Sequence, residues 1–310
     1  MDVRRQRRER DHRRRRRTGL VRLTAFVTLV GGVVVALVMV LGGAPGTTRA
    51  AASSPAESDA QISSRRAASS APALLSRPAR LPARTVSVPI LMYHRIDRIT
   101  PALPAITQRL TVDPTEFATE MRWLAGHGFH SITQLELFDA LERGGSLPSK
   151  PVLITFDDGY RDVFSKAMPV LRRLHLRATA YVITGRISGP DPSFLTWGML
   201  AGLERRGIEI GSHTVHHLEL PVLSNAQAMD ELVNSRHDLE RHLGHPVQWF
   251  AYPAGAEDPR TVALVRQAGY VLAVTTHAGS VQDARAPLEL HRYEVLDSTG
   301  VAGLASLLGS

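Results

Sequence analysis

The sequence predicts an α/β fold in which parallel strands and helices alternate to form a barrel. Between about residues 86 and 300, short apolar runs alternate with longer amphipathic segments, which is typical of parallel strands joined by helical crossovers. Polar groups stand directly after three of the apolar runs, at residues 157–158, 213 and 252–253. Barrel enzymes place their chemistry at the carboxyl ends of several strands, whereas an open sheet gathers it at one switch point. The pattern therefore favours the barrel.

The expected strands are apolar runs rich in β-branched residues. They lie at 88–93, 152–156, 178–183, 208–212, 247–251, 270–275 and 288–296. Helices are expected at 163–174, 197–206 and 225–243, and Pro169 must kink or divide the first of these. Another helix begins at Pro114, with Asp113 as its N-cap. Three residues form the apolar face of that helix: Phe117, Met121 and Leu124.

The first 41 residues combine a basic tail with an apolar segment. Residues 1–22 hold 11 Arg and three acidic residues, so they carry the whole net charge of +8. Residues 23–41 are uncharged and almost wholly apolar, which at ~1.5 Å per residue suffices to cross a hydrocarbon core of about 30 Å. The positive-inside rule then predicts a cytoplasmic tail at 1–22 and a transmembrane signal anchor at 23–43. The alternative is a cleaved signal peptide, although its apolar region usually spans only roughly 7–15 residues.

The rest of the chain divides into a linker and a folded domain. Residues 44–85 are rich in Ala, Ser, Pro and Arg, which predicts a disordered extracellular linker. The folded domain is expected at 86–300, outside the membrane. The chain has no Cys, so disulfides and thiolate metal ligands are excluded. Because the chain beyond the Arg-rich tail is neutral, we expect no nucleic-acid partner.

Carboxylates and imidazoles follow two of the predicted strands. Asp157 and Asp158 come directly after the run at 152–156, and His213 and His217 follow the run at 208–212. The two imidazoles are four residues apart and can face one ion if a helical turn begins there. Asp158, His213 and His217 thus form a candidate three-ligand site for one divalent metal ion, with an open position. Zinc suits this set best, with cobalt, nickel or manganese as alternatives.

Another interpretation of these residues is structural, because Asp residues at strand ends often cap helices and His residues are common on surfaces. In the catalytic interpretation, Asp157 is the general base, because neighbouring side chains of an extended segment point apart and it cannot share the ion in the same way. Asp157 could instead orient a ligand His. His216, between the two predicted ligands, is expected to be a solvated surface residue.

Six segments resemble motifs of the polysaccharide deacetylases, the NodB-homology domain of carbohydrate esterase family 4. The first two motifs are matched by Thr155-Phe156-Asp157-Asp158-Gly159-Tyr160 and Ser212-His213-Thr214-Val215-His216-His217. The others are similar to the branch that contains the poly-N-acetylglucosamine deacetylases. They are Leu91-Met92-Tyr93-His94-Arg95-Ile96, Phe194-Leu195-Thr196-Trp197, Phe250-Ala251-Tyr252-Pro253-Ala254-Gly255 and Leu290-His291-Arg292-Tyr293. The resemblance covers about residues 86–296.

This resemblance implies a distorted (β/α) barrel that removes acetyl groups from N-acetylated sugars with one divalent metal. Carried over, it makes Asp157 the base, Asp158, His213 and His217 the ligands, and the Ala254 N–H a donor to the oxyanion. Trp197 would help to wall the pocket. Aromatic rings suit the apolar faces of pyranoses. The residues expected to hold substrate are therefore Tyr160, Trp197, Tyr252, Pro253 and Ala254.

The chain departs from the family pattern at two places. Many members carry an Arg where Ala251 stands, and that Arg braces the base; Arg292 is a candidate substitute. The family's last motif supplies a His as the general acid, which makes His291 the candidate here, although the local pattern is not a clean match. His94 is a second candidate for that role.

These observations predict a metal-dependent hydrolase that removes N-acetyl groups from an N-acetylglucosamine-containing polysaccharide outside the cell membrane. One alternative is a deacetylase of a small acetylated molecule or an O-acetyl ester on the same scaffold. Another is a non-catalytic glycan-binding protein, which would tolerate a broken metal set. The expected partners are the polysaccharide and, through the N-terminal anchor, the membrane.

Overall fold

The computed structural model describes Leu75 and residues 84–309. Its centre is a parallel sheet with the strand order β12-β2-β6-β7-β8-β9-β10, and β5 pairs with the start of β6. The strands are β2 (Ile90–Tyr93), β5 (His130–Ser131), β6 (Pro151–Phe156), β7 (Ala178–Val182), β8 (Ile208–Ser212), β9 (Trp249–Ala251), β10 (Leu272–Val274) and β12 (Tyr293–Glu294). The predicted strands are confirmed in type and order. The last is much shorter than the expected 288–296.

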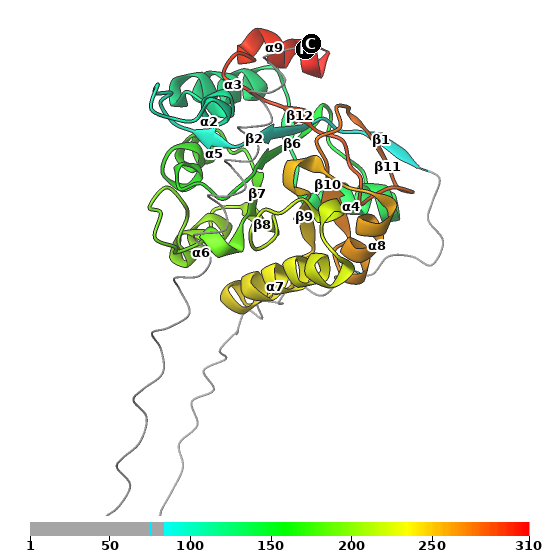
Figure 1. The fold of residues 1–310 in the computed structure, drawn as a ribbon. Coiled ribbons are helices and arrows are strands. Elements are labelled where there is room, and N and C mark those ends of the chain that lie inside the picture. Colours follow the sequence, from blue (N-terminus) through cyan, green and yellow to red (C-terminus); the bar gives the residue numbers. More distant parts are fainter. Residues whose placement is uncertain (1–74, 76–83, 310) are drawn as a thin grey trace, which may run out of the picture. The chain divides into compact units, whose positions relative to one another are not determined.

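One segment near the C-terminus closes the sheet on itself. Leu290 forms a parallel bridge with Val274 at the β10 edge, and three residues later β12 pairs with Leu91 and Met92 of β2 at the opposite edge. The twist of parallel strands brings these two edges toward each other. A curled parallel sheet with its helices outside fits the expected distorted (β/α) barrel (Figure 1).

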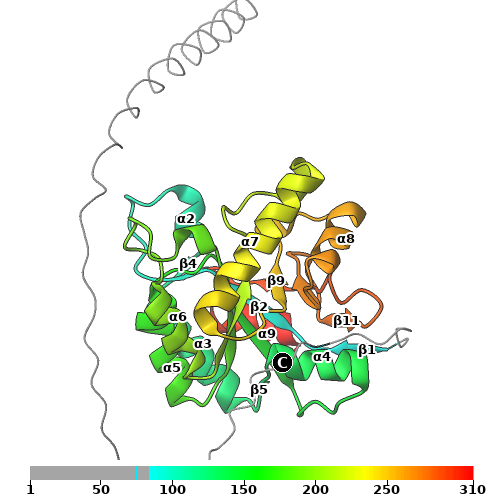
Figure 2. The same ribbon diagram turned by 90° about the horizontal axis from the view of Figure 1, so that it is seen from below.

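The helices surround the sheet (Figures 1 and 2). They are α2 (Ala105–Arg109), α3 (Pro114–Gly126), α4 (Gln134–Phe138), α5 (Met168–Arg173), α6 (Trp197–Glu204), α7 (Asn225–Leu243), α8 (Pro259–Gln267) and α9 (Gly300–Leu308). Asp113 caps α3 by accepting the Thr115 N–H at 2.8 Å, as the sequence predicts. The helix expected at 163–174 is divided at Pro169: a π-helical turn, η2 (Val163–Ala167), precedes α5. The final helix α9 continues past residue 300, where we expected the domain to end.

Shorter elements complete the fold. β1 (Thr85–Ser87) pairs antiparallel with β11 (Val281–Asp283), and β3 (Arg95–Ile96) pairs with β4 (Thr111–Val112). The remaining turns of helix are η1 (Asp139–Arg143), η3 (Thr184–Arg186), η4 (Leu220–Val222) and η5 (Pro253–Gly255). Both η3 and η5 stand close to the candidate site described below.

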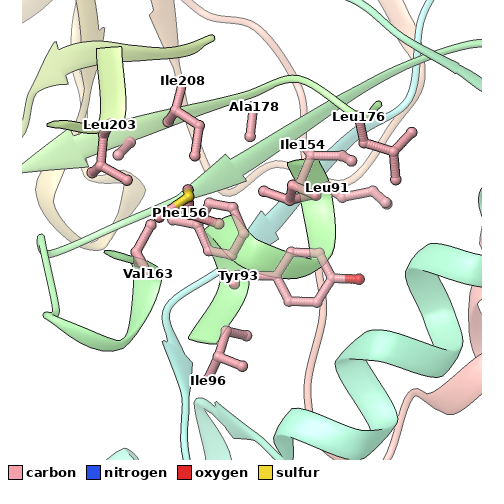
Figure 3. Packing of buried hydrophobic residues seen from close by; sticks show 14 of the residues in the cluster. Leu91, Tyr93, Ile96, Ile154, Phe156, Val163, Leu176, Ala178, Leu203 and Ile208 are labelled. Atoms are coloured by element: carbon pink, nitrogen blue, oxygen red, sulfur yellow. The ribbon is translucent and has the colours of Figure 1, made fainter. Parts of the chain in front are cut away.

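The largest hydrophobic cluster lies between the sheet and the helices on one side. Tyr93 and Phe156 come from neighbouring strands, and their ring centroids are 5.7 Å apart (Figure 3). Phe117 of α3 packs edge-on against Tyr93 at 5.4 Å. Phe117, Met121 and Leu124 are fully buried, which confirms the predicted apolar face of α3. This packing fixes the carboxyl ends of β2 and β6, where the candidate site begins.

Three segments predicted from the sequence lie almost wholly outside the residues that the structure describes. The Arg-rich tail at 1–22, the anchor at 23–43 and the linker at 44–85 lie outside the described residues, apart from Leu75 and residues 84–85. No helix in the described part of the chain is both long enough and apolar enough to cross a membrane.

Candidate active site

A cavity of about 480 Å³ opens at the carboxyl ends of the barrel strands, within the range of about 300–1,000 Å³ that is usual for ligand sites. His94, Asp157, His213 and Tyr252 all line it and follow directly after β2, β6, β8 and β9. Parallel strands end at the same face of a barrel, so residues far apart in sequence meet here.

The structure brings Asp158, His213 and His217 together in the wall of this cavity. Oδ1 of Asp158 lies 3.6 Å from Nε2 of each imidazole, and the three ligand atoms lie within 4.8 Å of one another. Nδ1 of His213 is hydrogen-bonded to the Ala251 carbonyl oxygen at 2.8 Å. When Nδ1 donates that hydrogen bond, the lone pair of Nε2 is left for a metal. The donor set and its spacing therefore fit one divalent cation.

Electrostatics around the three residues favour neutral forms in the absence of a cation. Burial, reinforced by the neighbouring Asp157, raises the pKa of Asp158 to about 7. Burial also lowers the pKa of His213 to about 3, so the imidazole is neutral, as a metal ligand must be. A divalent cation among these groups would be the largest local charge and would favour the Asp158 carboxylate.

Backbone strain concentrates at this site. Among the described residues seven non-glycine residues have positive φ, and four of them stand here: Asp158 (72°), Thr214 (67°), His217 (61°) and Ala254 (54°). Such conformations cost on the order of 1–3 kcal/mol each and persist only where the surroundings impose them. They are a feature of functional sites, where geometry is held against local preference.

Asp157 forms a bidentate ion pair with Arg292. The distances are 2.8 Å from NH1 to Oδ1 and 2.7 Å from NH2 to Oδ2, and both side chains are almost fully buried. The Nε–H of Arg292 donates to the Thr275 carbonyl at 2.7 Å, which fixes the guanidinium. Burial alone would raise the pKa of Asp157, but the adjacent Arg292 charge holds it well below the usual range. Asp157 is therefore ionised at neutral pH.

The two candidate acids occupy different places. His94 lines the cavity and is partly buried, and its buried Nδ1 has no hydrogen-bond partner in the described structure. Burial lowers the pKa of His94, while the negative charge of Asp157 acts in the opposite direction. His291 does not line the cavity; its ring lies against Gly279, and its backbone N–H donates to Gln282. Geometry thus favours His94, and the role of His291 stays a prediction.

Ala254 offers a backbone donor at the cavity. It lines the wall in a left-handed conformation, and its N–H has no acceptor among the described residues. The N–H of Tyr252, by contrast, is used by the Val274 carbonyl at 3.2 Å. Pro253 lies between them in η5 and does not line the cavity. Ala254 therefore offers a free N–H at this edge.

The structure does not bring Tyr160 or Trp197 to the cavity wall. The Tyr160 ring stacks on that of Phe194 with centroids 4.9 Å apart, and the Arg95 guanidinium lies 5.0 Å from the Tyr160 centroid. Trp197 begins α6 and stacks on His242 of α7, with centroids 3.7 Å apart and ring planes 3° apart. The assignment of both residues to substrate binding stays a prediction.

Sequence reasoning missed Glu231 and treated His216 as a bystander. Glu231 is almost buried on α7 and receives the backbone N–H of Val215 and of His216. The signal was present in the sequence, because Glu231 lies on the apolar face of α7. That face consists of Ala228, Glu231, Leu232, Ser235 and Leu239.

The comparison with known proteins identifies the family. YxkH of Bacillus subtilis strain 168, assigned to the polysaccharide deacetylases, is 32% identical over 222 residues, which span 72% of this chain and 75% of YxkH. The chain belongs to the polysaccharide deacetylase family. The sequence model of that family matches residues 144–273, which include all three candidate ligands and Asp157. The predicted family is thereby confirmed, and with it a hydrolase acting on amide bonds.

The chain is also similar to one further curated enzyme and to solved structures of deacetylases. The poly-beta-1,6-N-acetyl-D-glucosamine N-deacetylase of Staphylococcus aureus is 24% identical over 173 residues, which span 51% of this chain and 59% of that enzyme. Among solved structures, the deacetylase PplD of Streptococcus pyogenes, in complex with acetate, superposes with a TM-score of 0.67 and 28% identity, over 73% of this chain and 99% of PplD. IcaB of Ammonifex degensii gives 0.64 and 26%, over 72% and 97%.

Proposed function

We propose that this polysaccharide deacetylase removes N-acetyl groups from an N-acetylglucosamine-containing polymer outside the cell membrane, with one divalent metal ion. The observation that carries the proposal is the meeting of Asp158, His213 and His217 beside an Asp157 that Arg292 holds in place. The relatives named above support the substrate class. The apolar segment at 23–43, preceded by Arg residues, supports the location.

Asp158, His213 and His217 would hold the ion. When bound, such an ion polarises the amide carbonyl and lowers the pKa of water. Zinc suits one carboxylate and two imidazoles best. The side chains of the protein carry out the proton transfers.

Asp157 accepts the proton of the attacking water. Arg292 fixes both oxygens of Asp157, so the carboxylate is ionised and oriented before the substrate arrives. The Ala254 N–H stabilises the negative charge that develops on the acetyl oxygen. The protonated form of His94 donates a proton to the leaving sugar amine, and the proton that Asp157 accepted from water later restores that form. When Asp157 takes up a proton, its charge no longer supports the protonated ring of His94, which then becomes a stronger acid.

The cavity wall also suits a sugar ring. Ile106 of α2 lines the cavity and is 55% exposed. An apolar side chain in this position can cover the apolar face of a pyranose, and burial of that surface favours binding.

The deciding experiment measures acetate release from an N-acetylglucosamine oligomer, with and without a chelator. Asp157→Asn removes the base and Asp158→Ala removes one ligand, while Asp230→Asn changes an exposed carboxylate on α7 and serves as the control. Release that the chelator and both site variants abolish, and that the control retains, supports the proposal. Release from an O-acetyl ester alone would point instead to the esterase alternative.

The location has its own test. Protease is added to cells whose wall has been removed and whose membrane is intact. It should degrade the folded domain, while a cytoplasmic marker protein survives. A domain that is protected until the membrane is permeabilised would contradict the extracellular placement.

A further inference from the structure

The loop 213–217, between β8 and η4, carries two of the three candidate ligands, and its backbone carbonyls are held from one side. The N–H groups of Thr184 and Gly185 in η3 donate to the carbonyls of Thr214 and Val215 at 3.1 and 3.0 Å. A Cβ at Gly185 would lie 2.6 Å from the Val215 oxygen, closer than van der Waals contact allows. Only glycine permits this approach.

From the other side, a single carboxylate holds the N–H groups of the same loop. Oε2 of Glu231 accepts from the N–H of Val215 at 3.0 Å and of His216 at 2.8 Å. Its Oε1 lies 2.6 Å from Nδ1 of His216. Hydrogen bonds to an ionised group are roughly twice as strong as neutral ones. Glu231 thus joins two backbone groups and one side chain of the loop to α7.

The position of Glu231 makes these contacts rigid. Its side chain is only 9% exposed, whereas that of His216 is 66% exposed. A buried carboxylate is costly unless it is hydrogen-bonded, and these three contacts satisfy it. One helical turn along α7, Ser235 Oγ lies 2.7 Å from Ser212 Oγ at the end of β8. The same helix face therefore holds both the strand end and the loop that follows it.

The loop needs such support because its own conformation is strained. Thr214 and His217 both adopt positive φ, at 67° and 61°. Within the loop, the Thr214 hydroxyl accepts the His217 N–H at 2.9 Å, and the rings of His213 and His217 lie edge to face with centroids 4.7 Å apart. Without Glu231, we expect the loop to relax toward ordinary backbone angles and His217 to move relative to His213.

We propose that Glu231 is a positioning residue for the metal centre: it holds the 213–217 loop so that the imidazoles of His213 and His217 meet Asp158. This inference rests on the proposed metal centre and adds a residue that touches neither ion nor substrate. Partners that orient metal ligands typically contribute about 10–100-fold in metal affinity.

The test measures Zn²⁺ affinity of the full-length protein by competition with a chromophoric chelator, together with the visible absorption of bound Co²⁺. Glu231→Ala should weaken Zn²⁺ binding about 10–100-fold and alter the Co²⁺ spectrum. Glu231→Gln, which keeps the shape but not the charge, should fall between. Asp230→Asn, the exposed neighbour on the same helix, should change neither readout.

Gly185→Ala disturbs the loop from the opposite side and should weaken Zn²⁺ binding as well, even if Glu231→Ala does not fold. A folded Glu231→Ala that binds Zn²⁺ as tightly as the unchanged protein, with the same Co²⁺ spectrum, would overturn the inference. If the unchanged protein binds neither ion, the metal centre itself fails and the inference with it. If the unchanged protein binds Zn²⁺ but releases no acetate, only the proposed function fails, and the affinity comparison still decides the role of Glu231.

Discussion

Arg292 donates hydrogen bonds to both carboxylate oxygens of Asp157, although the two residues are 135 positions apart in the chain. The contact is possible because Arg292 lies between Leu290, which bridges to β10, and Tyr293, which pairs with β2. The segment that closes the barrel therefore also delivers the guanidinium into its interior. One short segment thus both joins the edges of the sheet and holds the candidate base.

Replacing Arg292 should damage both activity and stability. Arg292→Gln leaves Asp157 buried without its counter-charge, which typically costs about 3–5 kcal/mol of unfolding free energy. Loss of orientation at the base should lower kcat by about 10²-fold or more. Arg285→Gln is the matched control, because Arg285 also pairs with an Asp carboxylate but its side chain is 67% exposed. There little or no loss of unfolding free energy is expected, because an exposed pair is screened by solvent.

The same pair predicts a pH dependence. The pKa of Asp157 is lowered in the folded protein, so the unfolded chain takes up the proton first as pH falls. The stability from the pair is present above the unfolded pKa of about 3.9 and is lost below it. In urea titrations, the difference between Arg292→Gln and the unchanged protein should be large at pH 7 and smaller at the lowest pH where both fold. An equal difference at both pH values would contradict this assignment.

Glu120 should act in the opposite direction. It is fully buried, and burial raises its pKa to about 7, although the Tyr93 hydroxyl donates to it at 2.9 Å. The folded state therefore holds a proton that the unfolded state releases, so its contribution is complete below about pH 4.5 and is lost as pH rises through about 7.

Glu120→Gln should remove that loss, which is on the order of 3 kcal/mol between pH 4.5 and pH 8. Urea titrations of the variant should show a flatter dependence on pH than those of the unchanged protein. Asp230→Asn, exposed on α7, should leave the curve as it is. An unchanged slope in Glu120→Gln would show that folding does not raise the pKa of Glu120.

Local patterns predicted the elements well, because caps, prolines and apolar runs act over a few residues. Asp113 caps α3 and Pro169 divides a helix, as expected. Long-range contacts were harder to predict. Arg292 was only a candidate partner of Asp157, and nothing near it in sequence shows that the sheet closes there. Glu231 was missed because a charged residue on a helix is usually assumed to face solvent, and its partners lie in a distant loop.

A substitution of Trp197 can distinguish a structural role of this residue from a role in substrate binding. In the structure its ring stacks on His242 and so joins α6 to α7. Trp197→Ala should therefore lower the unfolding free energy by about 1–3 kcal/mol and leave KM for an oligomer nearly unchanged. His242→Ala removes the other half of the stack and should reproduce the effect. A raised KM with unchanged stability would instead support the substrate-binding role that the sequence motif predicts.

His94 and His291 compete for the role of proton donor, and the cavity geometry favours His94. His94→Gln should lower kcat by about 10²–10⁴-fold, the usual contribution of a positioned acid. It should leave Zn²⁺ affinity intact, because His94 is not among the three candidate ligands. His291→Gln should lower kcat little, because its ring lies against Gly279 rather than in the cavity wall.

A substrate whose leaving group has a low pKa distinguishes a variant that lacks the catalytic acid from one that is misfolded. An activated acetyl ester that departs without a proton should restore turnover in His94→Gln toward that of the unchanged protein, because no acid is then needed. The same substrate should not rescue Asp157→Asn, which lacks the base. If the ester rescues His291→Gln and not His94→Gln, the acid is His291, and the free Nδ1 of His94 has another purpose.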